Sequence, residues 1–235
     1  MTAPTSRDAT ADDLRLAPIF DGVSADAVRR ECPGAVVRAF EHGDVIYAQG
    51  ARCGDVFCVL SGQVKLARVS RDGEEFTTGM RTAGDLFGAA LNGTEAGEAP
   101  DTASAKGLVV AWGAPSAEFR NLMLHQPALG LRVVEALALR QKQMERRLEG
   151  FAFRRTEARL VETLRELSGG FEARCEHGFG RHIRLTQQEL ADLVGASRPV
   201  TSTILNRLRD KGVLGYTREY LCVRDIDAVE QMIDE

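Results

Sequence analysis

The chain has 235 residues, enough for one large domain or two of ordinary size. Its hydrophobic share of 44% and charged share of 27% are typical of a globular protein, and no apolar run approaches the roughly 20 residues that cross a bilayer. The net charge of -4 excludes a uniformly basic nucleic-acid-binding chain, although a small basic face can still contact phosphates under an acidic total.

The N-terminal segment is polar and contains acids from Met1 to Asp13. It lacks the basic and then apolar layout of a secretory signal. We therefore expect a disordered leader over residues 1–18, in a cytoplasmic protein with no membrane partner.

Glycines punctuate residues 35–112, and short runs typical of β-strands lie between them. Examples are residues 56–60 and 108–112, and Asp72-Gly73 is a hairpin turn signal because this pair tolerates positive φ. Short strands at near-regular spacing with glycine turns are typical of an all-β roll or barrel. The sequence predicts a jelly-roll-like β-roll domain over residues 19–125.

From residue 117 the hydrophobic period changes from that of strands to that of a helix. The apolar or compatible positions advance in steps of four and three, with charged residues on the flanks, which is the coiled-coil pattern. We predict a dimerisation helix over residues 126–152, although the same stripe could pack on the chain's own roll, and its first half could do so while the second half meets a partner. The predicted dimer interface consists of Val133, Val134, Leu137, Gln141, Met144, Leu148 and Phe151.

Two short helices with their own start and stop signals follow further along the chain. Thr186 with Glu189 three residues later forms a capping box, and Gly195 can end that helix in the left-handed conformation. Ser197 then caps a second helix, with Pro199 in its first turn, where no amide partner is lost. This spacing predicts a helix-turn-helix.

The outer face of the second helix is polar and without acids, as a DNA-recognition surface requires. Arginine and asparagine can read guanine and adenine edges, and serine and threonine can contact bases or phosphates. This face comprises Arg198, Pro199, Ser202, Thr203, Asn206 and Arg207, with Arg209, Lys211 and Arg218 nearby as phosphate contacts. Residues 213–216 and 220–223 look like a two-stranded wing, so we predict a winged helix-turn-helix domain over residues 153–235 and an α+β chain overall.

This order of roll, long helix and winged helix-turn-helix resembles the Crp/Fnr family of bacterial regulators. The likeness covers about residues 19–223 and includes GDVIYAQG at 43–50, VLSGQVKL at 59–66 and GDLFG at 84–88. The most specific match is LVGASR at 193–198, which is similar to the family's turn and the start of its recognition helix.

The resemblance implies a homodimer on a palindromic DNA site, with one helix in each major groove, and contact with RNA polymerase. By the same resemblance Arg198 contacts a base, and the residues that contact phosphates are Thr186, Gln188 and Ser197. The best-known branch has an acidic residue where Pro199 stands and a basic one where Thr203 stands, so we expect a different operator base at that position.

The effector is left unknown by the sequence, and cyclic AMP is disfavoured. Family members that bind it have a glutamate directly after the position of Gly88 and an Arg-Ser pair further along, whereas this chain has Ala89 there and the acids Glu98 and Asp101 later. An anionic phosphate beside two carboxylates, with no arginine, is disfavoured by charge. The open alternative is a regulator gated by cyclic AMP or another ligand through the roll pocket.

Other sensing chemistries have weaker support. The odd, scattered cysteines are not a disulfide framework, and we interpret Cys32, Cys53, Cys58, Cys175 and Cys222 as small buried or half-buried thiols. A thiol redox sensor using Cys53, Cys58 or Cys175 is an alternative that needs an exposed cysteine of low pKa. We expect no metal or other cofactor, because His42 and His125 are isolated.

The same sequence argues against two further classes of protein. A cyclic-nucleotide module of an enzyme would have the phosphate cassette and no recognition helix, which is the reverse of this chain. No nucleophile, base and orienting group form a recognisable motif, so we expect no enzymatic activity.

Overall fold

A computed structural model of the chain describes residues 5–8, 10–88, 97–169, 181–216, 221–224, 228 and 231. The chain divides into two compact units, Met1–Glu75 with Gly79–Arg140 and Phe76–Thr78 with Gln141–Glu235. The fold is α+β, as predicted.

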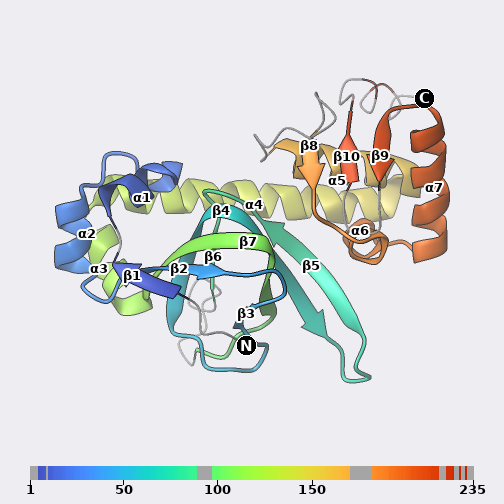
Figure 1. The fold of residues 1–235 in the computed structure, drawn as a ribbon. Helices are drawn as coiled ribbons and strands as arrows, with labels where there is room; N and C mark the ends of the chain where they lie inside the picture. Colours follow the sequence, from blue (N-terminus) through green and yellow to red (C-terminus); the bar gives the residue numbers. More distant parts are fainter. Residues whose placement is uncertain are drawn as a thin grey trace. The chain divides into compact units, whose positions relative to one another are not determined.

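The first unit is built around an antiparallel roll of strands (Figure 1). The strands are β1 (Thr5–Asp8), β2 (Val36–Phe40), β3 (Val45–Tyr47), β4 (Asp55–Val69), β5 (Glu75–Arg81), β6 (Leu86–Phe87) and β7 (Thr102–Pro115). They follow the order β1-β2-β7-β4-β5, while β3 pairs with β7 and β6 with β4. The predicted β-roll is confirmed.

The longest ladder joins β4 to β7, from Asp55 opposite Pro115 to Ala67 opposite Thr102. Its register shifts on both sides of Ser61, beside Gly62. Gly62 has φ +85°, and a Cβ there would lie 2.3 Å from the Leu108 carbonyl oxygen. Only glycine fits this irregularity, which lets two long strands bend together.

Helices pack on one end of the roll and complete its core. They are α1 (Ala11–Arg15), the 3-10 helix η1 (Pro18–Phe20), α2 (Ala25–Glu31), α3 (Ser116–His125) and the first half of α4 (Pro127–Phe153). The buried ring of Trp112 meets Phe20 at 4.9 Å and Phe119 at 5.8 Å between centroids. Leu129 and Val133 of α4 belong to the same core.

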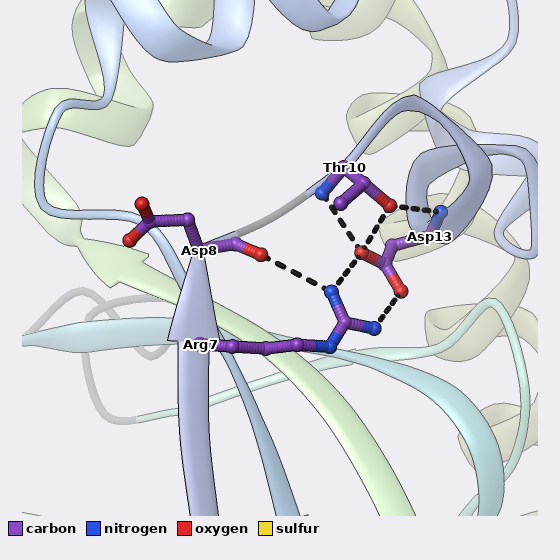
Figure 2. Close-up of polar contacts among 4 residues, drawn as sticks. All are labelled: Arg7, Asp8, Thr10 and Asp13. Atoms are coloured by element: carbon purple, nitrogen blue, oxygen red, sulfur yellow. Dashed lines mark hydrogen bonds and ion pairs between the residues drawn. The ribbon is translucent and has the colours of Figure 1, made fainter.

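The expected disordered leader is wrong for the residues that the structure describes within it. Strand β1 adds to the edge of the sheet, with Thr5 opposite Ala39 and Asp8 opposite Val36. Figure 2 shows how α1 is held to this strand: Arg7 donates to both carboxylate oxygens of Asp13, and Asp13 also accepts from the amide of Thr10. Leu14 and Ala17 are buried in the core, so their apolar surface stabilises the segment.

The second unit carries the helix-turn-helix. Its elements are α5 (Thr156–Gly169), β8 (Arg181–Ile183), α6 (Gln187–Val194), α7 (Arg198–Asp210), β9 (Leu214–Tyr216) and β10 (Leu221–Val223). The predicted two-stranded wing is part of a three-stranded antiparallel sheet in the order β8-β10-β9.

Within the described ranges no single helix is long and apolar enough to cross a membrane. Helices α3 and α4 reach that composition only as a pair, bent by 117°. Phe119, Leu122 and Leu129 of this pair are buried in the roll core.

The contacts of Asp13 lead to a prediction about the N-terminal segment. The hydrogen bond from Arg7 is the main cause that lowers the pKa of Asp13, and Thr10 lowers it further. Burial opposes this effect, but the pKa stays well below its ordinary value. Asp13→Ala removes the ion pair and half of the α1 capping box, a loss of about 1 kcal/mol for a cap of this kind. We expect faster hydrogen exchange at the amides of β1.

The pH dependence has a defined sign. A lowered pKa in the folded state contributes stability that is fully present above the ordinary carboxyl pKa, near ~4, and is lost as pH falls through the folded-state value. The native protein should therefore lose protection of β1 in acid, whereas Asp13→Ala should lack this change. Asp12→Ala is the matched control, because Asp12 makes only an exposed pair with Arg15 in the same helix. Equal exchange in both variants would show that Asp13 does not anchor the segment.

Candidate nucleic-acid interface

The first helix of the pair begins and ends where the sequence predicted. Thr186 accepts from the Glu189 amide at 3.2 Å, and the Thr186 amide donates to the Glu189 carboxylate at 2.9 Å, so the capping box is confirmed. Helix α6 ends at Gly195, which is left-handed with φ +65°. A Cβ on Gly195 would lie 2.4 Å from the Phe151 ring, so the turn requires glycine for its conformation and for space.

The start of α7 differs from the prediction in one respect. Ser197 occupies the cap position in extended backbone, but its hydroxyl makes no capping hydrogen bond. A capping side chain accepts from the second or third amide of the helix, and Pro199 leaves the second position without an N–H. The exposed Ser197 hydroxyl is consequently available to other groups.

The inner face of α7 packs against α6. The residues buried there are Thr201, Ile204, Leu205 and Leu208. Leu190 and Val194 of α6 are also buried, so the two helices share a core. The side chains on the opposite face of α7 are thereby directed outward.

The outer face contains exposed and half-buried groups. Exposed side chains are Gln188, Ser197, Arg198, Pro199, Thr203, Arg207, Arg209 and Lys211, while Thr186, Ser202 and Asn206 are half-buried. Several of them already have partners: Gln188 donates to Asp192 at 2.8 Å, and the Thr203 hydroxyl donates to the Pro199 carbonyl at 3.0 Å. In the part of the chain that the structure describes, Arg198 and Lys211 have no side-chain partner.

Two partners of this face were not foreseen from the sequence. Glu157 of α5 pairs with Arg207 at 2.5 Å. The hydroxyl of Tyr216 in β9 donates to the side-chain amide oxygen of Asn206 at 2.5 Å. The Arg209 guanidinium lies 5.4 Å from the centre of the Tyr216 ring. These residues lie outside α7 in the sequence, and no local pattern connects them to it.

Arg159 of α5 is a further residue that sequence analysis missed. Its guanidinium donates to the carbonyls of Val194 at 3.0 Å and Gly195 at 3.2 Å, and to that of Arg154 at 2.9 Å. It also lies 5.3 Å from the centre of the Phe151 ring. A cation at the last carbonyls of a helix is favourable, and here it fixes the turn before α7 to the end of α4.

The predicted seam of α4 is largely exposed in the single chain. Met144 is 61% and Leu148 65% exposed, and Val134, Leu137, Gln141 and Phe151 are exposed as well. Val133 is a correction to the predicted interface: it is only 5% exposed and packs in the roll core. The stripe therefore divides, because its first turn faces the chain's own roll.

Family models match both ends of the chain. Residues 37–126 match the cyclic nucleotide-binding domain, and residues 158–232 match the Crp-like helix-turn-helix domain. The chain belongs to the Crp/Fnr family. It is accordingly a transcription regulator with a DNA-binding helix-turn-helix.

Relatives extend over most of this Crp/Fnr protein. The global nitrogen regulator of Nostoc sp. is 28% identical over 208 residues, covering 86% of this chain and 93% of the relative. A CRP-like cAMP-activated global transcriptional regulator of Mycobacterium tuberculosis is 27% identical over 199 residues, covering 85% and 88%. A Crp/Fnr-family regulator of Thermus thermophilus is 25% identical with a TM-score of 0.64, covering 85% and 98%. Only one of these names specifies an effector, so membership alone does not assign one.

The interior of the roll contains a stacked aromatic cluster and a buried hydrogen bond between a tyrosine and a carboxylate. The rings of Tyr47, Phe57 and Phe87 stack, and the Tyr47 hydroxyl donates to the Asp101 carboxylate at 3.0 Å. Burial raises the pKa of both Tyr47 and Asp101. From α4, Arg140 donates to the Leu86 carbonyl at 3.5 Å, and burial lowers the pKa of its guanidinium. Ala89 and the rest of residues 89–96 lie outside the described residues.

Most of the described cysteines of this Crp/Fnr protein are buried. Cys53 and Cys58 are buried, and burial raises the pKa of the Cys58 thiol, which opposes a reactive thiolate there. Cys175 lies outside the described residues. In the described ranges no three His, Cys, Asp or Glu side chains gather as metal ligands. His42 instead accepts from the amide of Gly107 at 3.1 Å.

Proposed function

We propose that this regulator acts as a homodimer that binds a palindromic operator with one α7 in each of two major grooves. The observation that carries the proposal is the outer face of α7, which has no acidic residue between Arg198 and Arg209 and begins with an unpaired guanidinium. In helix-turn-helix proteins the N-terminal residues of the second helix contact base edges. We also propose contact with RNA polymerase, by analogy with the family alone.

The N-terminal ends of α6 and α7 support a division of roles among the polar groups. Arg198 is exposed in the first turn of α7 and can donate two hydrogen bonds to guanine. The Ser197 hydroxyl is not used by the cap, and the Thr186 hydroxyl accepts in its cap and so keeps its proton for a phosphate oxygen. Lys211 follows the end of α7, where a phosphate is the expected partner. The remaining residues of the outer face stay in the proposed interface.

The exposed seam of α4 supports dimerisation. Large apolar side chains recur along one face of a 27-residue helix and remain exposed in the single chain. Exposed apolar surface of this kind is typical of an interaction site. We propose that a second copy of the helix packs against Val134, Leu137, Gln141, Met144, Leu148 and Phe151.

A second proposal concerns the effector: the roll binds a small anion at Arg140. Among the described residues the Arg140 guanidinium has no carboxylate partner, and its one hydrogen bond, to the Leu86 carbonyl, is long. A desolvated cation without a counter-charge is costly, and a carboxylate or phosphate would offset that cost. We propose that cyclic AMP is not this anion, because Ala89, Glu98 and Asp101 replace the family's phosphate and ribose contacts.

Arg198 should determine the base preference of the protein, whereas Lys211 should contribute to its affinity for any DNA sequence. We expect Arg198→Ala to flatten base preference at one symmetric pair of operator positions, a loss of roughly 1–3 kcal/mol of discrimination. Lys211→Ala should weaken every sequence about equally and reduce the salt slope by about one. Binding to a library of single-base operator variants measures both. If Arg198→Ala lowers affinity uniformly, Arg198 contacts only the DNA backbone and does not read a base.

Charges placed in the α4 seam should separate the dimer. The double variant Leu137→Asp, Leu148→Asp places carboxylates at two positions along an apolar interface. Burying each charge costs roughly 3 kcal/mol, which weakens association at least about 100-fold. Sedimentation should then show monomers at concentrations where the native protein is dimeric. Leu139→Asp is the matched control, because Leu139 is 60% exposed but lies off the seam. A double variant that remains dimeric would show that the seam is assigned wrongly.

An anion bound at Arg140 should stabilise the protein in melting experiments. At about 100 times its Kd a ligand adds about 2.7 kcal/mol, or a rise in Tm of roughly 5–10 °C for a protein of this size. We expect one member of a panel of phosphate, small carboxylates and cyclic nucleotides to give this rise. Arg140→Gln should abolish it, and Lys142→Gln, an exposed cation on the same helix, should not. An equal rise in Arg140→Gln contradicts the site, and micromolar binding of cyclic AMP contradicts its exclusion.

A further inference from the structure

The first strand of the wing is attached to the outer face of the recognition helix. Tyr216, at the end of β9, donates its hydroxyl proton to the Asn206 side chain at 2.5 Å. Both residues are half-buried and belong to the same compact unit. Figure 1 shows β9 beside α7, consistent with the packing of the two elements.

This hydrogen bond limits what Asn206 can do on DNA. Recognition of adenine by an asparagine uses both halves of the amide, the oxygen as acceptor and the nitrogen as donor. Here one of the two lone pairs of the oxygen accepts from the Tyr216 hydroxyl, and the side chain is half-buried beside β9. Turning the amide round keeps the contact, because the phenol oxygen would then accept from one of the two amide N–H groups. In either orientation the amide is anchored to the wing, which restricts the directions in which it can meet a base edge.

Arg209 adds a second contact to the same ring. Its guanidinium lies 5.4 Å from the centre of the Tyr216 ring, and its side chain is 49% exposed. A guanidinium over an aromatic face is held in orientation but keeps N–H donors at its edge. Arg209 is thus directed by the wing and still able to donate to a phosphate oxygen.

We propose that Asn206 and Tyr216 are positioning residues that tie the wing to α7, and that Asn206 does not read a base. The pair fixes β9 and orients Arg209, so that both contribute to backbone contacts that are the same for every DNA sequence. This inference rests on the proposed DNA interface and assigns sequence reading to the other side chains of α7.

The test compares Tyr216→Phe, Asn206→Ala and the double variant on the library of single-base operator variants. Tyr216→Phe keeps the ring and its contact with Arg209, so it removes only the hydrogen bond. We expect each single variant to lower affinity by about 2- to 12-fold, the range of one hydrogen bond, equally for all operators. The double variant should be no weaker than either single one, because both remove the same interaction. Arg198→Ala serves as the reference for loss of base preference.

Two outcomes overturn the proposal. One is a change of base preference in Asn206→Ala that Tyr216→Phe does not share, which would make Asn206 a base reader. The other is multiplication of the two losses in the double variant, which would show that the residues act separately.

Hydrogen exchange measured without DNA tests the attachment of the wing independently of DNA binding. Hydrogen exchange of the β9 amides should be faster in both single variants and no faster in the double one. Unchanged exchange in the single variants overturns the attachment of the wing, whatever the DNA result. A native protein that selects no sequence from a random pool contradicts the proposed DNA interface instead.

Discussion

The hydrogen bonds of Arg159 complete a helix end that would otherwise have unsatisfied carbonyl groups. Helix α6 ends at a left-handed glycine, and Val194 and Gly195 there accept from the Arg159 guanidinium. The same guanidinium lies over Phe151, and the Phe151 ring occupies the space that a Cβ of Gly195 would need. The direction in which α7 leaves the turn is therefore set jointly by a glycine, an aromatic ring and the hydrogen bonds of one guanidinium. A base-reading role for Arg198 depends on this, because Arg198 begins the helix that follows.

The electrostatics of the interface are local rather than global. The chain carries a net charge of -4, yet the outer face of α7 bears arginines and no acid. One of these arginines, Arg207, is paired with Glu157, and another, Arg209, lies on the Tyr216 ring. Internal pairing lowers the number of counterions that DNA binding releases, since a neutralised guanidinium contributes less to the salt slope. The face consequently favours directed contacts over general attraction to the DNA backbone.

The parts of the site that the sequence predicted depend on neighbours close in the chain. The capping box of Thr186 and Glu189 and the left-handed Gly195 are local, and both were found from spacing alone. The N-terminal leader was misread because its order comes from pairing with β2 and from Asp13, not from a long apolar pattern. Val133 was assigned to the wrong partner because a helical stripe shows that a face is buried but not what covers it. The bonds of Asn206 to Tyr216 and of Arg207 to Glu157 join separate elements, and no spacing rule predicts them.

Helix α4 is the element that belongs to both compact units, since their boundary falls between Arg140 and Gln141 within one uninterrupted helix. An anion at Arg140 would act on the half of α4 that packs on the roll, while Phe151 lies at its other end beside the helix-turn-helix. A ligand shifts a conformational equilibrium only by the difference between its affinities for the two states, and a change from 1:99 to 99:1 requires a difference of about 5.5 kcal/mol. Burial lowers the pKa of the Arg140 guanidinium, so its charge is disfavoured without a counter-charge, and a bound anion would offset that cost. The charge of Arg140 is therefore the feature of the roll best able to supply such a difference, more so than its stacked aromatic rings, which are packed against one another without a ligand.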